Sequence, residues 1–159
     1  MKYKLYGIAR WLCVAAITVV IIVSSVGAGK SAADAEVVFE SVASVINTEG
    51  MTKADRIMIK RLFGIDVNDY ESVHLLYPSD NMGAKELLIV KLKDDSDMNA
   101  LIRAVDERLS TQKKSFEGYG VEQFALLTDK SVCETTGNFL IFVVSDEYEH
   151  AIEAFRNAI

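Results

Sequence analysis

Two histidines are the residues of this chain best suited to acid–base or metal chemistry. His74, in "SVHLLYP", could act as a base or ligate a metal, but no Cys or His lies at ligand spacing from it, so a strand-surface histidine is the simpler interpretation. His150 has three carboxylates close by that could hold a cation: Asp146, Glu149 and Glu153. A solvated acidic helix face explains the same residues, and we therefore assign neither histidine to a site.

A calcium loop is the second chemical pattern in the sequence. The stretch "DDSDMNALIRAVD" places four oxygen-bearing residues at the first, third, fifth and twelfth positions of such a loop: Asp95, Asp97, Asn99 and Asp106. The sixth position is Ala100, where the sharp turn requires glycine, and helical periodicity runs through the whole stretch. We therefore predict a helix capped by Ser96 or Asp95, with Asp97 near the positive end of the helix dipole.

The remaining polar and aromatic clusters have structural explanations. Two carboxylate pairs are present, Asp66 with Asp69 and Asp94 with Asp95, at loop and helix starts where acids usually serve as caps. In "FEGYG", Tyr119 could line a pocket, but we expect it to form an aromatic lid on the core after a helix. The sequence contains no phosphate loop, nucleophile elbow, zinc-protease helix or paired cysteine cluster. We therefore assign no catalytic, cofactor-binding or metal-binding residue.

Two amphipathic helices are predicted ahead of the first clear strand. The first covers residues 34–47, where apolar residues recur at helical spacing. The second is capped by Thr52 and ends at Gly64, and its expected buried stripe consists of Ala54, Ile57, Met58 and Leu62. A polar turn then leads to the strand "SVHLLYP", which ends at Pro78.

A sequence repeat organises the rest of the chain. "ELLIVKLKD" and "NFLIFVVSD" superimpose with Ile89 on Ile141, and after a slip of two residues "NALIRAVDERL" overlays "EHAIEAFRNAI". A further strand precedes each copied strand, "SVHLLYP" in one half and "KSVCET" in the other. The sequence therefore predicts an α+β fold in which a ββα-ββα repeat forms a four-stranded antiparallel sheet, with helices at residues 97–112 and 146–157 on one face.

The second face of this sheet also needs a cover. In "NFLIFVVS" both alternating sets of side chains are apolar, which is typical of a strand buried on both faces. We expect the two N-terminal helices to cover the second face and to complete a layered domain. A homodimer that uses this face is the alternative.

The first thirty residues have the order of an export signal. Lys2, Lys4 and Arg10 precede an apolar stretch from Trp11 to Val23, and small residues follow. The stretch is also nearly long enough to span a bilayer, so residues 1–30 are interpreted either as a cleaved signal peptide or as a single transmembrane anchor. Both alternatives place residues 31–159 outside the cytoplasm as one extracytoplasmic domain.

Charge and cysteine content limit the partners and the thiol chemistry expected of the chain. After Arg10 the chain has 14 bases and 23 acids, a net charge of −9, so nucleic acid is a poor partner. A local basic run could meet an anionic surface, although a solvated helix face is its commoner meaning: Lys53, Arg56, Lys60 and Arg61. Cys13 lies too early in the apolar stretch for lipid attachment. Cys133 is left as a lone thiol, which we interpret as a small hydrophobe in a strand rather than a reactive group.

The chain after the leader resembles the bacterial extracytoplasmic domains catalogued as domain of unknown function 4358. The resemblance lies in the amphipathic N-terminal helix, "GID" after a basic helix, Ala84 and Glu86 opening a strand, "RLSTQKKSFEGYG", and "GNFLIFVVSD". Phe139 stands where this family often has tyrosine. The resemblance implies an extracytoplasmic location and a fold, and it supplies no catalytic residue.

The function expected from the sequence is noncatalytic recognition. We expect an exported, membrane-associated module of the bacterial cell envelope that binds a protein or another envelope component and needs no cofactor. An enzyme with an unrecognised site of Asp or Glu with Tyr119 is the chief alternative. A domain that binds a small ligand or a metal is the third.

Overall fold

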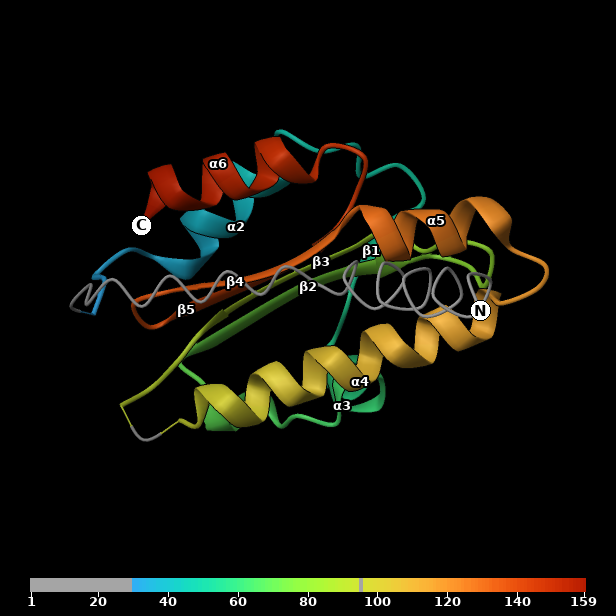
Figure 1. The fold of residues 1–159 in the computed structure, drawn as a ribbon. Helices are drawn as coiled ribbons and strands as arrows, with labels where there is room; N and C mark the ends of the chain where they lie inside the picture. Colours follow the sequence, from blue (N-terminus) through green and yellow to red (C-terminus); the bar gives the residue numbers. More distant parts are fainter. Residues whose placement is uncertain (1–29, 95) are drawn as a thin grey trace, which may run out of the picture.

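The computed structural model describes residues 30–94 and 96–159, which form a three-layered α+β domain (Figure 1). The helices are α2 (Ala35–Ala43), α3 (Arg56–Phe63), α4 (Met98–Phe116), α5 (Val121–Asp129) and α6 (Tyr148–Ala158). The strands are β1 (Met51–Lys53), β2 (Ser72–Pro78), β3 (Glu86–Lys91), β4 (Ser131–Thr136) and β5 (Phe139–Val144), and a 3-10 turn covers Val67–Asp69. Within these ranges no helix combines the length and apolarity needed to cross a membrane. Residues 1–29, with most of the predicted leader and Cys13, lie outside the described part.

The sheet has five antiparallel strands in the order β1-β2-β3-β5-β4, one more than predicted. The additional strand is β1, in which Thr52 lies opposite Tyr77 of β2. The prediction that Thr52 caps the second helix is therefore wrong. Asp55 caps α3 instead, because its side chain accepts a hydrogen bond of 2.8 Å from the N–H of Met58.

The predicted repeat appears at the centre of the sheet. β3 and β5 are neighbours, and Ile89 lies directly opposite Ile141, its equivalent in the repeat. β2 and β4 flank this central pair on either side. All four strands predicted from the repeat are present, and β2 has the predicted bounds Ser72–Pro78.

Both faces of the sheet are buried, as the two-sided apolar pattern predicted. On one face Leu88 and Phe142 pack with residues of α3, α4 and α5. On the other face Leu87 and Ile141 pack with residues of α2 and α6. The face that the alternative, a homodimer, would use is thus occupied by helices of the same chain (Figure 1).

The distribution of the helices differs from the prediction. α4 and α6 were expected on one face, but they lie on opposite faces, and α3 accompanies α4 whereas α2 accompanies α6 (Figure 1). The two connections explain the difference. Six residues join β3 to α4 and the buried Leu92 among them turns toward the α4 layer, whereas three residues join β5 to α6. The repeat in sequence is therefore a repeat of strands more than of complete units.

Some helix ends and buried residues of the structure differ from those predicted. α2 ends at Ala43 rather than near residue 47, and Val45 beyond it is 40% exposed. In α3, Ile57 of the predicted stripe is 72% exposed, and Ile59 and Phe63 are buried in its place. α5 was not predicted at all. The end of α3 at Gly64 is confirmed, and this residue has the positive φ of 71° that favours glycine at a helix C-terminus.

Candidate functional site

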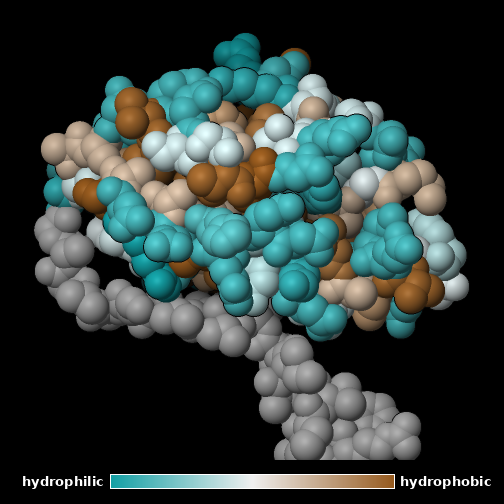
Figure 2. Space-filling view, turned by 90° about the horizontal axis from the view of Figure 1, so that it is seen from above, coloured by the Kyte–Doolittle hydropathy of each residue, from teal (hydrophilic) through white to brown (hydrophobic). Residues whose placement is uncertain are grey.

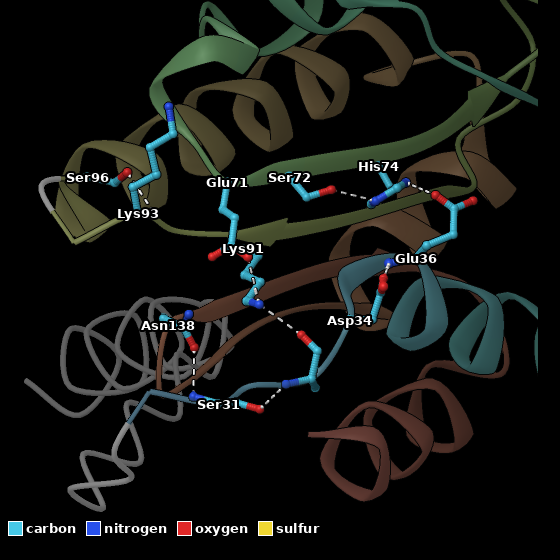
Figure 3. A network of polar contacts seen from close by, with 11 residues as sticks. Ser31, Asp34, Glu36, Glu71, Ser72, His74, Lys91, Lys93, Ser96 and Asn138 are labelled. Atoms are coloured by element: carbon cyan, nitrogen blue, oxygen red, sulfur yellow. Dashed lines mark hydrogen bonds and ion pairs between the residues drawn. The ribbon is translucent and has the colours of Figure 1, made fainter.

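A polar cluster around His74 joins β2 to the start of α2 (Figure 3). The Nε2 atom of His74 lies 2.7 Å from the Oγ atom of Ser72, and its Nδ1 atom lies 3.3 Å from a carboxylate oxygen of Glu36. The imidazole also stacks on Phe39 of α2, with the ring centroids 5.2 Å apart. Ser72 and His74 are two residues apart on one strand, so their side chains leave the same face of the sheet.

Burial disfavours the charged form of the His74 imidazole. Its side chain is 11% exposed, and burial lowers the pKa of His74 below its ordinary value, while the charge of Glu36 opposes this shift. A neutral imidazole between a hydroxyl and a carboxylate has the order of a serine–histidine–acid relay, in which the imidazole accepts the hydroxyl proton. The other carboxylate oxygen of Glu36 lies 3.2 Å from Lys53 Nζ, which competes for the same acid.

Lys91 forms the second half of this cluster. Its ammonium donates a hydrogen bond of 2.9 Å to the carbonyl of Ala33 and lies 2.8 Å from a carboxylate oxygen of Glu71. Close by, the N–H of Ser31 donates to the side chain of Asn138 at 3.0 Å (Figure 3). Since Lys91 is only 8% exposed, these contacts fasten the segment before α2 to the sheet. The contacts of the whole cluster therefore attach α2 to the sheet.

The residues around His150 do not form one site. His150 and Glu149 are exposed on α6, and Asp146 precedes this helix. Asp146 lines a cavity with Asp80 and Lys130, whereas Glu149 and Glu153 line a different groove beside β4. Across the described ranges, no three His, Cys, Asp or Glu side chains gather closely enough to hold a metal ion.

The positions of the predicted calcium loop belong to a helix. Asp97 is the N-cap of α4, and its Oδ1 atom accepts hydrogen bonds from the N–H groups of Asn99 and Ala100 at 2.9 and 3.1 Å. The expected cap, Ser96 or Asp95, is thus wrong by one or two positions, and Asp95 itself lies outside the described residues. Asp106 lies further along the same helix, which runs straight through the supposed loop.

Of the described residues in the two predicted carboxylate pairs, Asp66 is the one that serves as a cap. Asp66 precedes the 3-10 turn and accepts from the N–H of Asn68 at 3.0 Å, and this contact lowers the pKa of Asp66. Asp69 lies within that turn, and Asp94 forms an exposed ion pair with Lys30. Asp66 and Asp94 thus have structural partners, and Asp69 belongs to the turn that Asp66 caps.

Tyr119 and Cys133 differ in how well they were predicted. Tyr119 is 63% exposed, so the expected lid on the core is wrong, and Phe116 is the buried ring of that segment. Cys133 is buried in β4, and burial raises the pKa of its thiol to about 12. A thiol with this pKa is inert at neutral pH, as expected for a small hydrophobe.

The edge of β4 is the feature that the sequence did not reveal. β4 pairs only with β5, as the last strand of the sheet. The carbonyl of Lys130 accepts from the N–H of Ser145 and therefore faces β5. Because these directions alternate along an antiparallel strand, the backbone groups of Ser131, Cys133 and Thr135 face away from the sheet. Among the described residues no backbone group bonds to the outer edge at Cys133 or Thr135.

A groove between β4 and α6 follows this edge. We call it the β4–α6 groove, and its lining includes Val132, Glu134, Tyr148, Ile152 and Arg156. Glu134 is 3% exposed, and its two carboxylate oxygens accept from Arg156 at 2.7 and 2.6 Å. Figure 2, which looks onto the side of α2 and α6, shows a mainly hydrophilic surface with apolar side chains between the polar ones.

Comparison with known proteins identifies the family to which the domain is similar. The model of a domain of unknown function (DUF4358) matches residues 44–145. This segment contains the whole sheet with α3, α4 and α5, whereas α2 and α6 lie outside it. No curated protein matches the chain, and neither does any solved structure.

Proposed function

The chain belongs to the DUF4358 family, domains of unknown function, and we propose that it is an exported, membrane-associated and noncatalytic module that recognises another protein of the bacterial cell envelope. The observation that carries this proposal is the outer edge of β4. The outward backbone groups of Ser131 and Thr135, two partly exposed residues of this six-residue strand, lie there next to the β4–α6 groove. An exposed strand edge is a common recognition surface for an extended segment of a partner.

The location outside the cytoplasm is supported by the sequence of the leader. Lys2, Lys4 and Arg10 precede the apolar stretch, and this order directs the following domain across the membrane. The fold agrees with such a location, because its stability comes from two buried apolar clusters and its lone described cysteine is buried. The domain therefore has no requirement for a reducing compartment.

Two measurements test the proposal in cells that produce the chain. A topology reporter fused after Ile159 should be active outside the cytoplasm, and activity inside would contradict the location. A photo-crosslinking amino acid placed at Thr135 in the full-length chain should yield a covalent adduct with another protein. The same amino acid at Glu107, which is exposed on α4, is the control. Absence of an adduct specific to Thr135 would remove the recognition role.

A second candidate function is acyl-ester hydrolysis, which the relay of Ser72, His74 and Glu36 favours. In this reaction Ser72 Oγ attacks the acyl carbon, His74 Nε2 takes the hydroxyl proton and returns it to the departing alcohol, and water then releases the acid. A fluorophosphonate probe should label the full-length chain and fail to label Ser72→Ala. An unlabelled wild-type chain at high probe concentration would eliminate this candidate.

A further inference from the structure

We infer that the outer edge of β4 binds an extended peptide segment bearing lysine or arginine, which joins the sheet as an additional strand beside α6. The inference rests on the proposed recognition function and specifies the chemistry of the partner segment. Three properties of the edge support it: the direction of the backbone groups, the composition of β4, and the charge of the groove.

The backbone of β4 is complementary to another strand. Ser131, Cys133 and Thr135 direct their N–H and C=O groups outward. Ser131 and Thr135 are partly exposed whereas Cys133 is 4% exposed, so the accessible donors and acceptors lie toward the two ends of the strand. The sequence "SVCETT" contains no proline and no lysine, the residues that usually protect exposed edges. At the opposite edge β1 has only three residues, one of which is Lys53. β4 is therefore the edge of the described sheet that suits strand addition.

A charge on the covered face can also protect an edge, and Glu134 lies on that face. Its carboxylate is already neutralised by the bidentate contact with Arg156. Both partners of this ion pair belong to the domain, and the side chain of Arg156 is 52% exposed. Glu134 therefore lines the groove, and its paired charge does not prevent another strand from pairing with β4.

The groove has an excess of negative charge. In addition to Glu134, three carboxylates line it: Asp129, Glu149 and Glu153. Arg156 is the cation of this lining, and Lys130 stands nearby with Nζ 5.6 Å from the centre of the Tyr148 ring. The four acids outnumber these two bases, so a cationic side chain of the peptide is favoured over an anionic one.

The apolar residues of the groove indicate which side chains of the peptide would enter it. Val132 and Ile152 lie in the groove with the ring of Tyr148. Alternate side chains of an added strand point to the same face, so those directed toward α6 enter the groove. A segment that combines β-branched and basic residues at such positions matches both the apolar floor and the acids.

Peptide binding to the full-length chain in a mild nonionic detergent tests the inference. The probe is a short fluorescent peptide whose alternate positions, which share one face of the strand, include both lysine and valine, and fluorescence polarisation is the readout. Two matched peptides are the controls: one with glutamate for lysine, and one with N-methyl groups on alternate amides. We expect the lysine peptide to bind at least about tenfold more tightly than either control. Equal binding of the three peptides would overturn the inference.

Variants of the chain locate the binding. Thr135→Pro removes the outward N–H at a position that makes no ladder bond, whereas Thr135→Val keeps the N–H and strand propensity. We expect Thr135→Pro to weaken binding by at least about tenfold and Thr135→Val to bind like the wild type. Glu153→Lys should weaken binding, and Glu107→Lys on α4 should not. If Thr135→Pro, shown to be folded by circular dichroism, binds like the wild type, the edge is not the site.

The outcomes also separate this inference from the proposed function. An adduct at Thr135 in cells, combined with no preference for the lysine peptide, would support the proposed protein partner. It would overturn the inference that the bound segment of this partner carries lysine or arginine. Absence of the adduct together with a cytoplasmic reporter would instead contradict the proposed function.

Discussion

Ile89 of β3 lies directly opposite Ile141 of β5 at the centre of the sheet, and the two residues are also equivalent positions of the sequence repeat. Both side chains are fully buried in the cluster beneath α2 and α6. The two copied strands are thus antiparallel neighbours, and they are related by an approximate two-fold axis at this pair of residues. Because antiparallel neighbours contact each other directly across the ladder, this pair should be energetically coupled.

Shortening this pair should therefore be costly and non-additive. We expect Ile89→Ala and Ile141→Ala each to lower the free energy of unfolding by about 2–5 kcal/mol, because each leaves a cavity in a close-packed layer. The double variant should depart from the sum by at least about 0.5 kcal/mol, since the two sites share one cavity. Denaturant unfolding measures the cycle, and strict additivity would show that the two side chains do not interact.

Local patterns predicted the elements of the fold better than their arrangement. The two-sided apolar pattern of β5 and the strand ending at Pro78 were readable because they depend on neighbouring residues. β1 was not, since its pairing of Thr52 with Tyr77 is a long-range contact and Thr52 also suits a helix cap. α5 was missed because its N-cap, Gly120, makes no side-chain hydrogen bond.

The candidate sites depend even more on long-range contacts. His74 was recognised from its residue type, but Glu36 reaches it only because α2 crosses β2. The spacing of Ser72 and His74 on one strand was the available signal for the relay. The edge of β4 follows from the pairing of β3 with β5, which leaves β4 outermost. No property of "SVCETT" alone distinguishes an edge strand from a central one.

The N-cap of α4 provides a test that separates helix capping from calcium binding. Asp97→Ala should lower the free energy of unfolding by about 1 kcal/mol, because two N–H groups lose their acceptor, and Asp97→Asn should stay close to the wild type. Millimolar calcium should leave the thermal unfolding curve of the wild type unchanged. Glu107→Ala serves as the control for loss of an exposed acid. A rise in melting temperature with calcium would contradict the capping interpretation.

The pair of Glu134 and Arg156 should contribute to stability through the burial of its acid. Arg156→Met leaves a carboxylate that is 3% exposed without its partner, and we expect a loss of about 1–3 kcal/mol in the free energy of unfolding. Arg156→Lys should lose less, since it keeps the charge but not the two parallel hydrogen bonds. Adding Glu134→Gln to Arg156→Met should restore part of the loss. Equal stability of the three single and double variants in denaturant would contradict this role.

His74 should make the domain less stable in mild acid. Because burial lowers its folded-state pKa below the ordinary value, the unfolded chain takes up the proton first as the pH falls. The free energy of unfolding should therefore decrease below about pH 6.5, until the folded chain is protonated as well. His74→Gln should flatten this part of the profile, and the difference between the wild-type and variant profiles isolates the contribution of His74. Parallel profiles for wild type and His74→Gln would contradict the prediction.

Glu86 should produce the opposite dependence on pH. Its side chain is fully buried beneath α4, 3.3 Å from the Nε atom of Arg108, and burial raises the pKa of Glu86 to about 7 although Arg108 opposes the shift. The folded chain consequently retains a proton that the unfolded chain releases above the ordinary value of 4.5. The free energy of unfolding contributed by this group should fall between about pH 4.5 and pH 7, by an amount on the order of 3 kcal/mol.

The variant that isolates this contribution is Glu86→Gln, which keeps the shape of the side chain and removes its titration. The difference between the unfolding free energies of wild type and Glu86→Gln should change with pH across this window, because contributions from His74 and all other groups cancel. Glu107→Gln on the exposed face of α4 is the control for the removal of a carboxylate that is not buried. A constant difference for Glu86→Gln as well would show that Arg108 keeps the carboxylate ionised in the folded domain, with its pKa near the ordinary value.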